Sequence, residues 1–204
     1  MIAVPGIDQL FAKSLIEIIS SDLGPKTLKK IENRLFEKFG LTLTQSVEQF
    51  DSLDLVLREF FGKGADALER KFFEKILKVK TKKSNNEWFT LSDPYANSII
   101  LKTYGDLEKR RILETVSDTP KIINDILKDC DLPRTSGYRK INSMIDDGLL
   151  FKSDHIVVEN KKINKYVCVF SNLKINIEKN KMSIDVQFTD FERQSSPLLQ
   201  TILQ

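Results

Sequence analysis

The stretch at 132–150, LPRTSGYRKINSMIDDGLL, constrains the fold most, because it predicts an amphipathic helix held between a proline and a glycine. Pro133 makes the entry rigid, and either Thr135 or Ser136 can cap the helix N-terminus. Gly148 is placed to end the helix before an apolar pair. The residues at helical spacing that can face inward are Gly137, Ile141 and Met144 or Ile145. An ordinary amphipathic helix whose charged face is only solvated would show the same pattern, so a role for this helix depends on the segments that flank it.

The segments on both sides of this helix supply that context. Upstream, Asp106 caps a predicted helix over 106–116, and Thr119 caps a second one that runs through Cys130. Downstream, a strand begins at 149–151, residues 160–164 form a hairpin tip, and 166–170 form the returning strand. Helix, helix, turn, helix and hairpin is the order of a winged helix-turn-helix, whose last helix reads the major groove of DNA.

The outer face of the predicted reading helix, residues 134–147, combines hydroxyl donors, an aromatic ring and cations, which suits contact with DNA. From Pro133 to Cys168, seven cations outnumber four acidic residues, although the whole chain carries a formal charge of only +3. The candidate DNA contacts on this helix and the predicted wing are Arg134, Thr135, Ser136, Tyr138, Arg139, Lys140, Ser143, Lys161, Lys162 and Lys165.

These motifs resemble the archaeal ArsR-like winged-helix transcription regulators. The resemblance covers roughly residues 87–170, and it rests on Ile112-Leu113, Ile126-Leu127, the run LPRTSGYRKI at 132–141, and GLL at 148–150. It implies binding of double-stranded DNA by a homodimer, with the helix at Asp93–Tyr104 helping to join two subunits. The metal-sensing branch carries a Cys-Val-Cys type motif, which this chain lacks, so a metal-sensing role is not implied.

Residues 7–78 predict four helices with short joints, a small helical bundle. Leu23-Gly24-Pro25 separates the first two, and Thr42 with Gln45 has the spacing of a capping box that opens the third. The phenylalanines at helical spacing are better explained by core packing than by a ligand box. The runs GPKTLKKIENRLFEKFG and LREFFGKGA resemble a small helical domain attached to signalling proteins of ammonia-oxidising archaea, which implies an output or interaction role and no particular site.

The expected fold class is mainly α with an α+β part, divided into four segments. Residues 1–80 form the helical bundle, 81–86 a basic linker, 87–171 the winged helix-turn-helix, and 172–204 a β-hairpin with a tail. The linker can touch DNA phosphates or be simply solvated. Trp88–Leu91 predicts a short strand or an anchor, 173–188 alternate as a hairpin that must extend a sheet or meet a partner subunit, and 197–203 predict a short helix.

The sequence offers no catalytic or metal-binding constellation, so we expect neither an enzyme nor a cofactor. His155 is the only histidine and is either a surface residue or a phosphate contact. Cys130 and Cys168 predict two reduced core thiols, although a redox pair remains open. No signal peptide or membrane span is apparent, which predicts a cytoplasmic protein with no membrane partner.

Two functional hypotheses follow. The first is a sequence-specific DNA-binding transcription regulator, a homodimer formed by Asp93–Tyr104 and the hairpin 173–188, whose N-terminal bundle contacts a protein partner or passes on a signal. The second is a non-enzymatic interaction or signalling module that uses its winged helix as a scaffold for protein, because fold alone does not dictate function.

Overall fold

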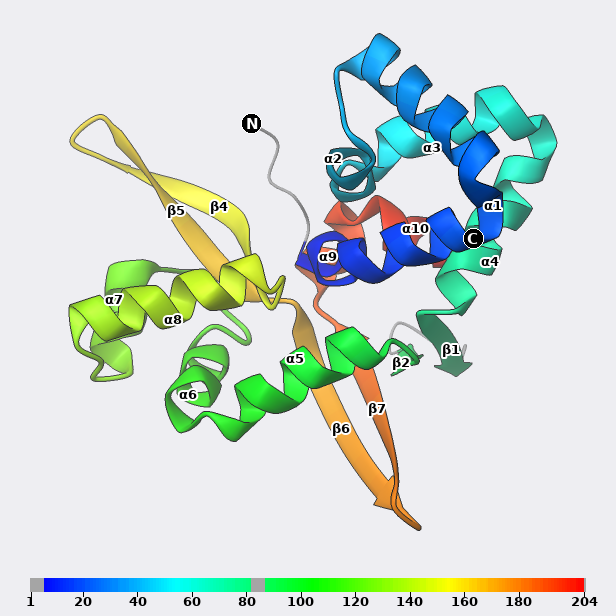
Figure 1. The fold of residues 1–204 in the computed structure, drawn as a ribbon. Coiled ribbons are helices and arrows are strands. Elements are labelled where there is room, and N and C mark those ends of the chain that lie inside the picture. The colour runs from blue at the N-terminus through cyan, green and yellow to red at the C-terminus, as the bar shows by residue number, and fades with distance from the viewer. Residues whose placement is uncertain (1–5, 82–86, 204) are drawn as a thin grey trace.

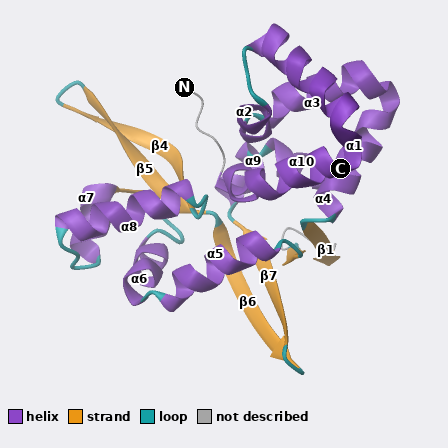
Figure 2. Ribbon diagram, in the orientation of Figure 1, coloured by secondary structure: helices purple, strands orange, loops and turns teal. Residues whose placement is uncertain are grey.

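A computed structural model, which describes residues 6–81 and 87–203, gives a mixed α+β fold with two antiparallel sheets (Figures 1 and 2). Helices lie in two groups on opposite sides of the molecule, and two long hairpins project from it in different directions (Figure 2). The expected α+β class is confirmed in this coarse form.

Helix α1 (Gly6–Phe39) begins the fold and contains the predicted break as a kink. Gly24 has φ 70° and ψ 163°, a conformation that a side chain would oppose, and Pro25 follows it. The expected first and second helices are therefore the two halves of one bent element. The buried face of the first half comprises Ile7, Leu10, Phe11, Leu15 and Ile19.

Three further helices pack around α1: α2 (Leu43–Glu48), α3 (Phe50–Phe61) and α4 (Ala65–Glu74). The helical turn η1 (Gly62–Gly64) connects α3 to α4. The Thr42–Gln45 capping box is confirmed, with both reciprocal bonds present. The expected third helix is wrong in one respect, because non-helical angles at Gln49 divide it into α2 and α3. The predicted C-terminal helix is confirmed as α10 (Pro197–Leu203), which packs against α1, α3 and α4.

The larger sheet has the strand order β1-β2-β7-β6 and joins distant parts of the chain. Its strands are β1 (Leu77–Thr81), β2 (Trp88–Leu91), β6 (Phe170–Glu178) and β7 (Lys181–Phe188). The predicted hairpin at 173–188 thus extends a sheet, because β7 pairs with β2. Thr81 of the expected linker ends β1, and 82–86 lie outside the described residues.

The smaller sheet, β3-β5-β4, lies with a group of helices. Along the chain these elements are α5 (Pro94–Gly105), α6 (Leu107–Thr115), β3 (Lys121–Ile122), α7 (Ile123–Asp129), α8 (Arg134–Asp146), β4 (Leu150–Val158) and β5 (Lys161–Cys168). Asp93 and Asp106 cap α5 and α6 as expected. The cap predicted at Thr119 is wrong, since Lys121 and Ile122 pair with β5 before the helix begins.

The first turn of α1 contacts the corner between α8 and β4 and also α9 (Asp190–Ser195). Its backbone lies so close to Gly148, at the corner between α8 and β4, that a Cβ on Gly148 would stand 2.6 Å from the Leu10 nitrogen. Gln9 Nε2 donates to the Asp146 carbonyl at 3.1 Å. The carboxylate of Glu192, in α9, accepts hydrogen bonds from the Gly6 and Ile7 nitrogens. Contacts therefore cross the predicted domain boundaries, which themselves stay a prediction.

Candidate nucleic-acid interface

Helix α8 is held by its inner face, as the sequence predicts. Ile141 and Met144 are fully buried, and Gly137 is buried where α8 meets α7. A Cβ at Gly137 would overlap the Leu127 side chain, so only glycine permits this approach of the two helices. This packing fixes which side of α8 remains in solvent.

The beginning of α8 differs from the expectation. The helix starts at Arg134 with Pro133 as its N-cap residue, and no side chain caps it. The cap predicted at Thr135 or Ser136 is therefore wrong, because both residues already lie inside the helix. Ser136 instead donates from Oγ to the Pro133 carbonyl at 3.3 Å. Thr135 is exposed on the first turn, where the backbone N–H groups attract anions.

A stripe of exposed side chains runs along α8 on the side away from the core. Arg134, Thr135, Tyr138 and Arg139 are exposed, and Tyr138 donates its hydroxyl to Asn124 Oδ1 of α7 at 2.9 Å. Asn142 continues the stripe one turn beyond Tyr138 and was missed by sequence reasoning, although its spacing of seven from Thr135 places it there. Together these side chains present a guanidinium, a hydroxyl and an amide, which are the groups that read base edges.

Two of the predicted contacts, Lys140 and Ser143, have partners on α6. Lys140 reaches back to α6, where its ammonium pairs with the Asp106 carboxylate and with Glu108 at 3.1 Å. Hydrogen bonding to Asp106 raises the pKa of Lys140 and lowers that of Asp106. Ser143 accepts from Lys109 Nζ at 3.1 Å. Both side chains therefore join α8 to α6, and their assignment to DNA stays a prediction.

The predicted wing is the hairpin of β4 and β5, and its tip differs by a few residues from the expectation. The turn is Glu159–Asn160, both with positive φ, so Lys161 and Lys162 already belong to β5. Because neighbouring strand residues point to opposite faces, Lys161 and Lys165 share one face of the wing, and Lys162 lies on the other beside Val157. The wing therefore offers cations on both sides.

The remaining chemistry-bearing residues show no site around the interface. His155 is partly exposed on β4, with Nδ1 3.8 Å from Asp154. Cys130 and Cys168 are free and buried, as expected for core thiols, and burial raises the pKa of Cys168 to about 12. Across residues 6–81 and 87–203, no group of three or more His, Cys, Asp or Glu side chains could hold a metal ion.

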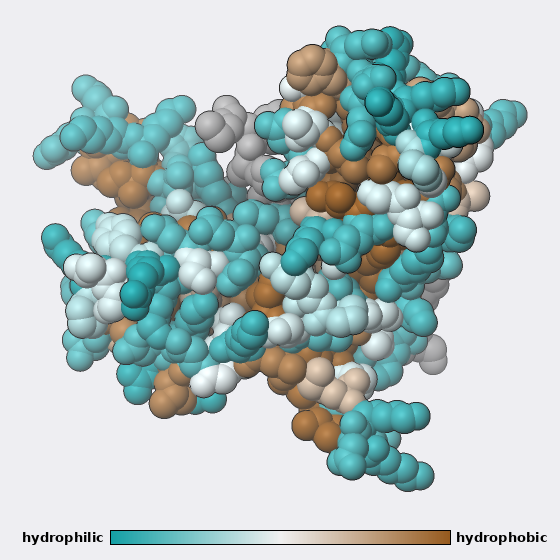
Figure 3. Space-filling model, viewed as in Figure 1, coloured by the Kyte–Doolittle hydropathy of each residue, from teal (hydrophilic) through white to brown (hydrophobic). Residues whose placement is uncertain are grey.

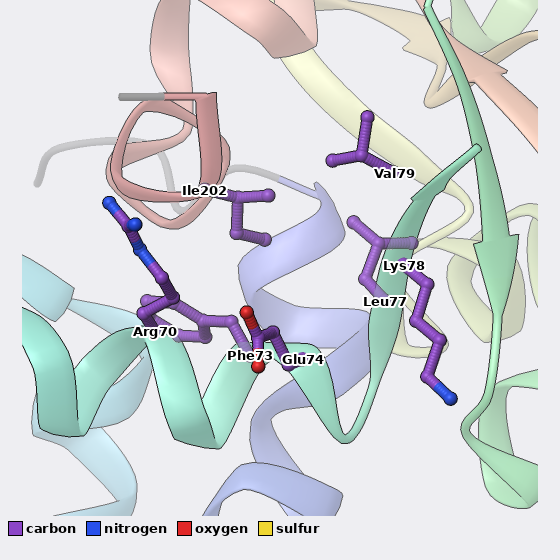
Figure 4. A pocket seen from close by; sticks show the side chains of 7 residues that line it. All are labelled: Arg70, Phe73, Glu74, Leu77, Lys78, Val79 and Ile202. Carbon is purple, nitrogen blue, oxygen red and sulfur yellow. The ribbon is translucent and has the colours of Figure 1, made fainter. Parts of the chain in front are cut away.

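A groove of about 440 Å³ lies elsewhere, between α4, β1 and α10 (Figure 4). Its floor is apolar, and Lys78 extends away from Ile202. The lining brings together no nucleophile, histidine or carboxylate pair that could perform acid–base chemistry. The residues that line it are Arg70, Phe73, Glu74, Leu77, Lys78, Val79 and Ile202.

Comparisons with protein-family models, with curated proteins and with solved structures found no match to this chain. In the part of the chain that the structure describes, no helix has both the length and the apolar character needed to cross a membrane. The interpretation of the interface therefore depends on its own geometry.

Proposed function

We propose that residues 107–168 form a winged helix-turn-helix that binds double-stranded DNA, and that the chain is a transcription regulator. The observation that carries the proposal is the order α6-β3-α7-α8-β4-β5 with an outward stripe of Arg134, Thr135, Arg139 and Asn142 on the third helix. This order, with strand arrangement β3-β5-β4, matches what a reading helix followed by a wing requires.

The exposed groups divide into two roles. Arg139 lies one turn beyond Thr135 and can grip a guanine edge through two hydrogen bonds. Lys161, Lys162 and Lys165 on the wing neutralise phosphates, which positions the protein without reading sequence. The near-neutral charge of the whole chain means that phosphate affinity is local to these elements rather than spread over the surface.

The experiment compares binding of a selected duplex and a scrambled duplex over a salt series. Arg139→Ala should remove preference at one base pair, worth about 1–3 kcal/mol, and leave scrambled-duplex binding nearly unchanged. Lys162→Ala should weaken both duplexes equally and lower the salt slope by about one for each phosphate left without its cation. Lys30→Ala, which removes an exposed charge from α1, is the matched control and should change neither. If Arg139→Ala weakened both duplexes equally, α8 would not be reading bases.

One observation favours the alternative of a protein-binding scaffold. Val157 and Val158, next to the wing tip, are 62% and 46% exposed. Apolar residues at the tip of a hairpin suit a protein surface as well as a groove edge. Selection from a random duplex library at two salt concentrations separates the two functions, because a scaffold would enrich no sequence and would lose its weak binding as salt rises.

We further propose that the regulator acts as a homodimer and that the N-terminal helices, whose packing around α1 resembles a small bundle, bind a protein partner. A two-fold protein matches a palindromic site with half-sites about one helical turn apart. The helix predicted to join subunits, α5, has Tyr95 exposed near its start. Light scattering of the free protein tests the homodimer separately from DNA reading.

A further inference from the structure

The hairpin of β6 and β7 projects from the molecule (Figure 1), and one of its faces is apolar. Its directly opposed pairs Leu173–Val186, Ile175–Ile184 and Ile177–Met182 lie on that face. Val186 and Ile184 are fully buried, but Ile175 is 38%, Met182 42% and Ile177 70% exposed toward the tip. Figure 3 shows hydrophobic surface on this hairpin, just before its hydrophilic end. The ladder thus continues beyond the core that covers its base.

Strand β6 is also an edge strand, since it pairs with β7 on one side and ends the order β1-β2-β7-β6. The turn at Lys179–Asn180 has two positive-φ residues, so the flanking pair Glu178–Lys181 is hydrogen-bonded across the turn. Alternation along an antiparallel ladder then turns the N–H and C=O groups of Ile175 and Ile177 toward the open edge. These groups are a ready template for another strand.

The charges on β6 select one partner and one register. Lys174 and Glu178 lie on the polar face of the strand, on either side of Asn176. If two copies of β6 pair antiparallel about Asn176, each Lys174 faces the Glu178 of the second copy. The same register sets Ile175 opposite Ile177 of the second copy, so the outward backbone groups meet. If the register were instead centred on Lys174, the Lys174 side chains of the two copies would face each other.

We propose that β6 pairs with β6 of a second copy in this register, which joins the two larger sheets into one. A two-fold axis perpendicular to the sheet keeps both apolar faces on the same side, so four isoleucines and two methionines shield one another from water. This interface rests on the homodimer proposed above and gives it a location. The β4–β5 wing projects in another direction, so the pairing leaves it uncovered (Figure 1).

Lys174 has a second neighbour that the test must take into account. Its ammonium lies 4.0 Å from the centre of the Trp88 ring, and it neighbours Asp185 across the ladder. Changing Lys174 therefore alters contacts inside one copy as well as between copies. Glu178, whose partner within the chain is Lys181, provides the independent variant.

The experiment measures self-association of the full chain without DNA, by sedimentation velocity at micromolar concentration. Lys174→Glu and Glu178→Lys each create two like-charge contacts per dimer, so each alone should raise the dimer dissociation constant at least about tenfold. Mixing the two variants restores opposite charges at both contacts, and a heterodimer with near wild-type affinity should form. Far-UV circular dichroism and thermal melting confirm that each variant is folded.

A second pair of variants tests the apolar contact. Ile177→Lys should also raise the dissociation constant at least about tenfold, whereas Val157→Lys, at a similarly exposed position on the other hairpin, should not change it. A monomeric wild-type chain would overturn the pairing and the homodimer together. A dimer that both charge variants leave intact, or a mixture that does not recover, would overturn the pairing but not the homodimer. DNA reading by Arg139 is measured separately and does not depend on this result.

Discussion

Two buried carboxyl groups, Asp8 of α1 and Glu192 of α9, predict that the protein loses stability as pH rises above about 4. Asp8 and Glu192 are fully buried, and burial is the main reason that their pKa values rise to about 7 and about 8. Ser196 donates to Asp8 Oδ1, which lowers the pKa only in part, and Asp8 Oδ2 has no partner among the described residues. Each group is therefore neutral in the folded protein at mildly acidic pH.

The sign follows from comparing the folded and unfolded chains. An unfolded aspartate with a pKa of 3.8 is ionised at pH 5, whereas folded Asp8 keeps its proton until about pH 7. The raised pKa gives stability that is full below about pH 4 and is lost as pH rises to about 7. Over the roughly two pH units from 5 to 7, at 1.36 kcal/mol per unit, Asp8 contributes about 3 kcal/mol. Glu192 adds a further loss of folding stability, which continues as pH rises to about 8.

The assay is urea unfolding followed by circular dichroism at steps from about pH 5 to about pH 8. Asp8→Asn keeps an oxygen for Ser196 but cannot ionise, so its free energy of unfolding should rise relative to wild type by about 3 kcal/mol across this range. Asp118→Asn, at an exposed carboxylate, is the control and should follow wild type. A wild-type curve that is flat over this range, or an Asp8→Asn curve parallel to it, would refute the reasoning.

Three further changes test other parts of the structure. Gly148→Ala should lower the free energy of unfolding by about 3 kcal/mol, because a Cβ at φ 73° is strained and meets the backbone of α1. An unchanged denaturation midpoint would contradict the close contact between Gly148 and α1. Lys140→Ala should lower stability by about 1 kcal/mol without changing base preference in a duplex selection, and a changed preference would return Lys140 to the reading face. Native Cys168 should resist a thiol reagent at neutral pH and react after unfolding, as mass spectrometry would show, since burial raises its thiol pKa to about 12.

Features whose signals lie within a few residues could be predicted from the sequence. The capping box at Thr42, the caps at Asp93 and Asp106, and the inward face of α8 all depend on contacts one or two helical turns apart. The strand alternation of the hairpin at 173–188 is equally local. On the candidate interface, the exposed positions of Arg134, Thr135 and Arg139 follow from the same helical spacing.

Which distant groups meet depends instead on the tertiary structure. Lys140 and Arg139 are adjacent in sequence, and the position of α6 alone turns one into an ion-pair partner and leaves the other in solvent. Glu192 caps α1 across most of the chain length, and β7 pairs with β2 although the winged-helix elements lie between them in the sequence. β3 replaces the first turn of a predicted helix because its backbone pairs with β5. Such contacts leave no local pattern, because their free energy depends on where the whole fold brings two segments together rather than on the spacing within either one.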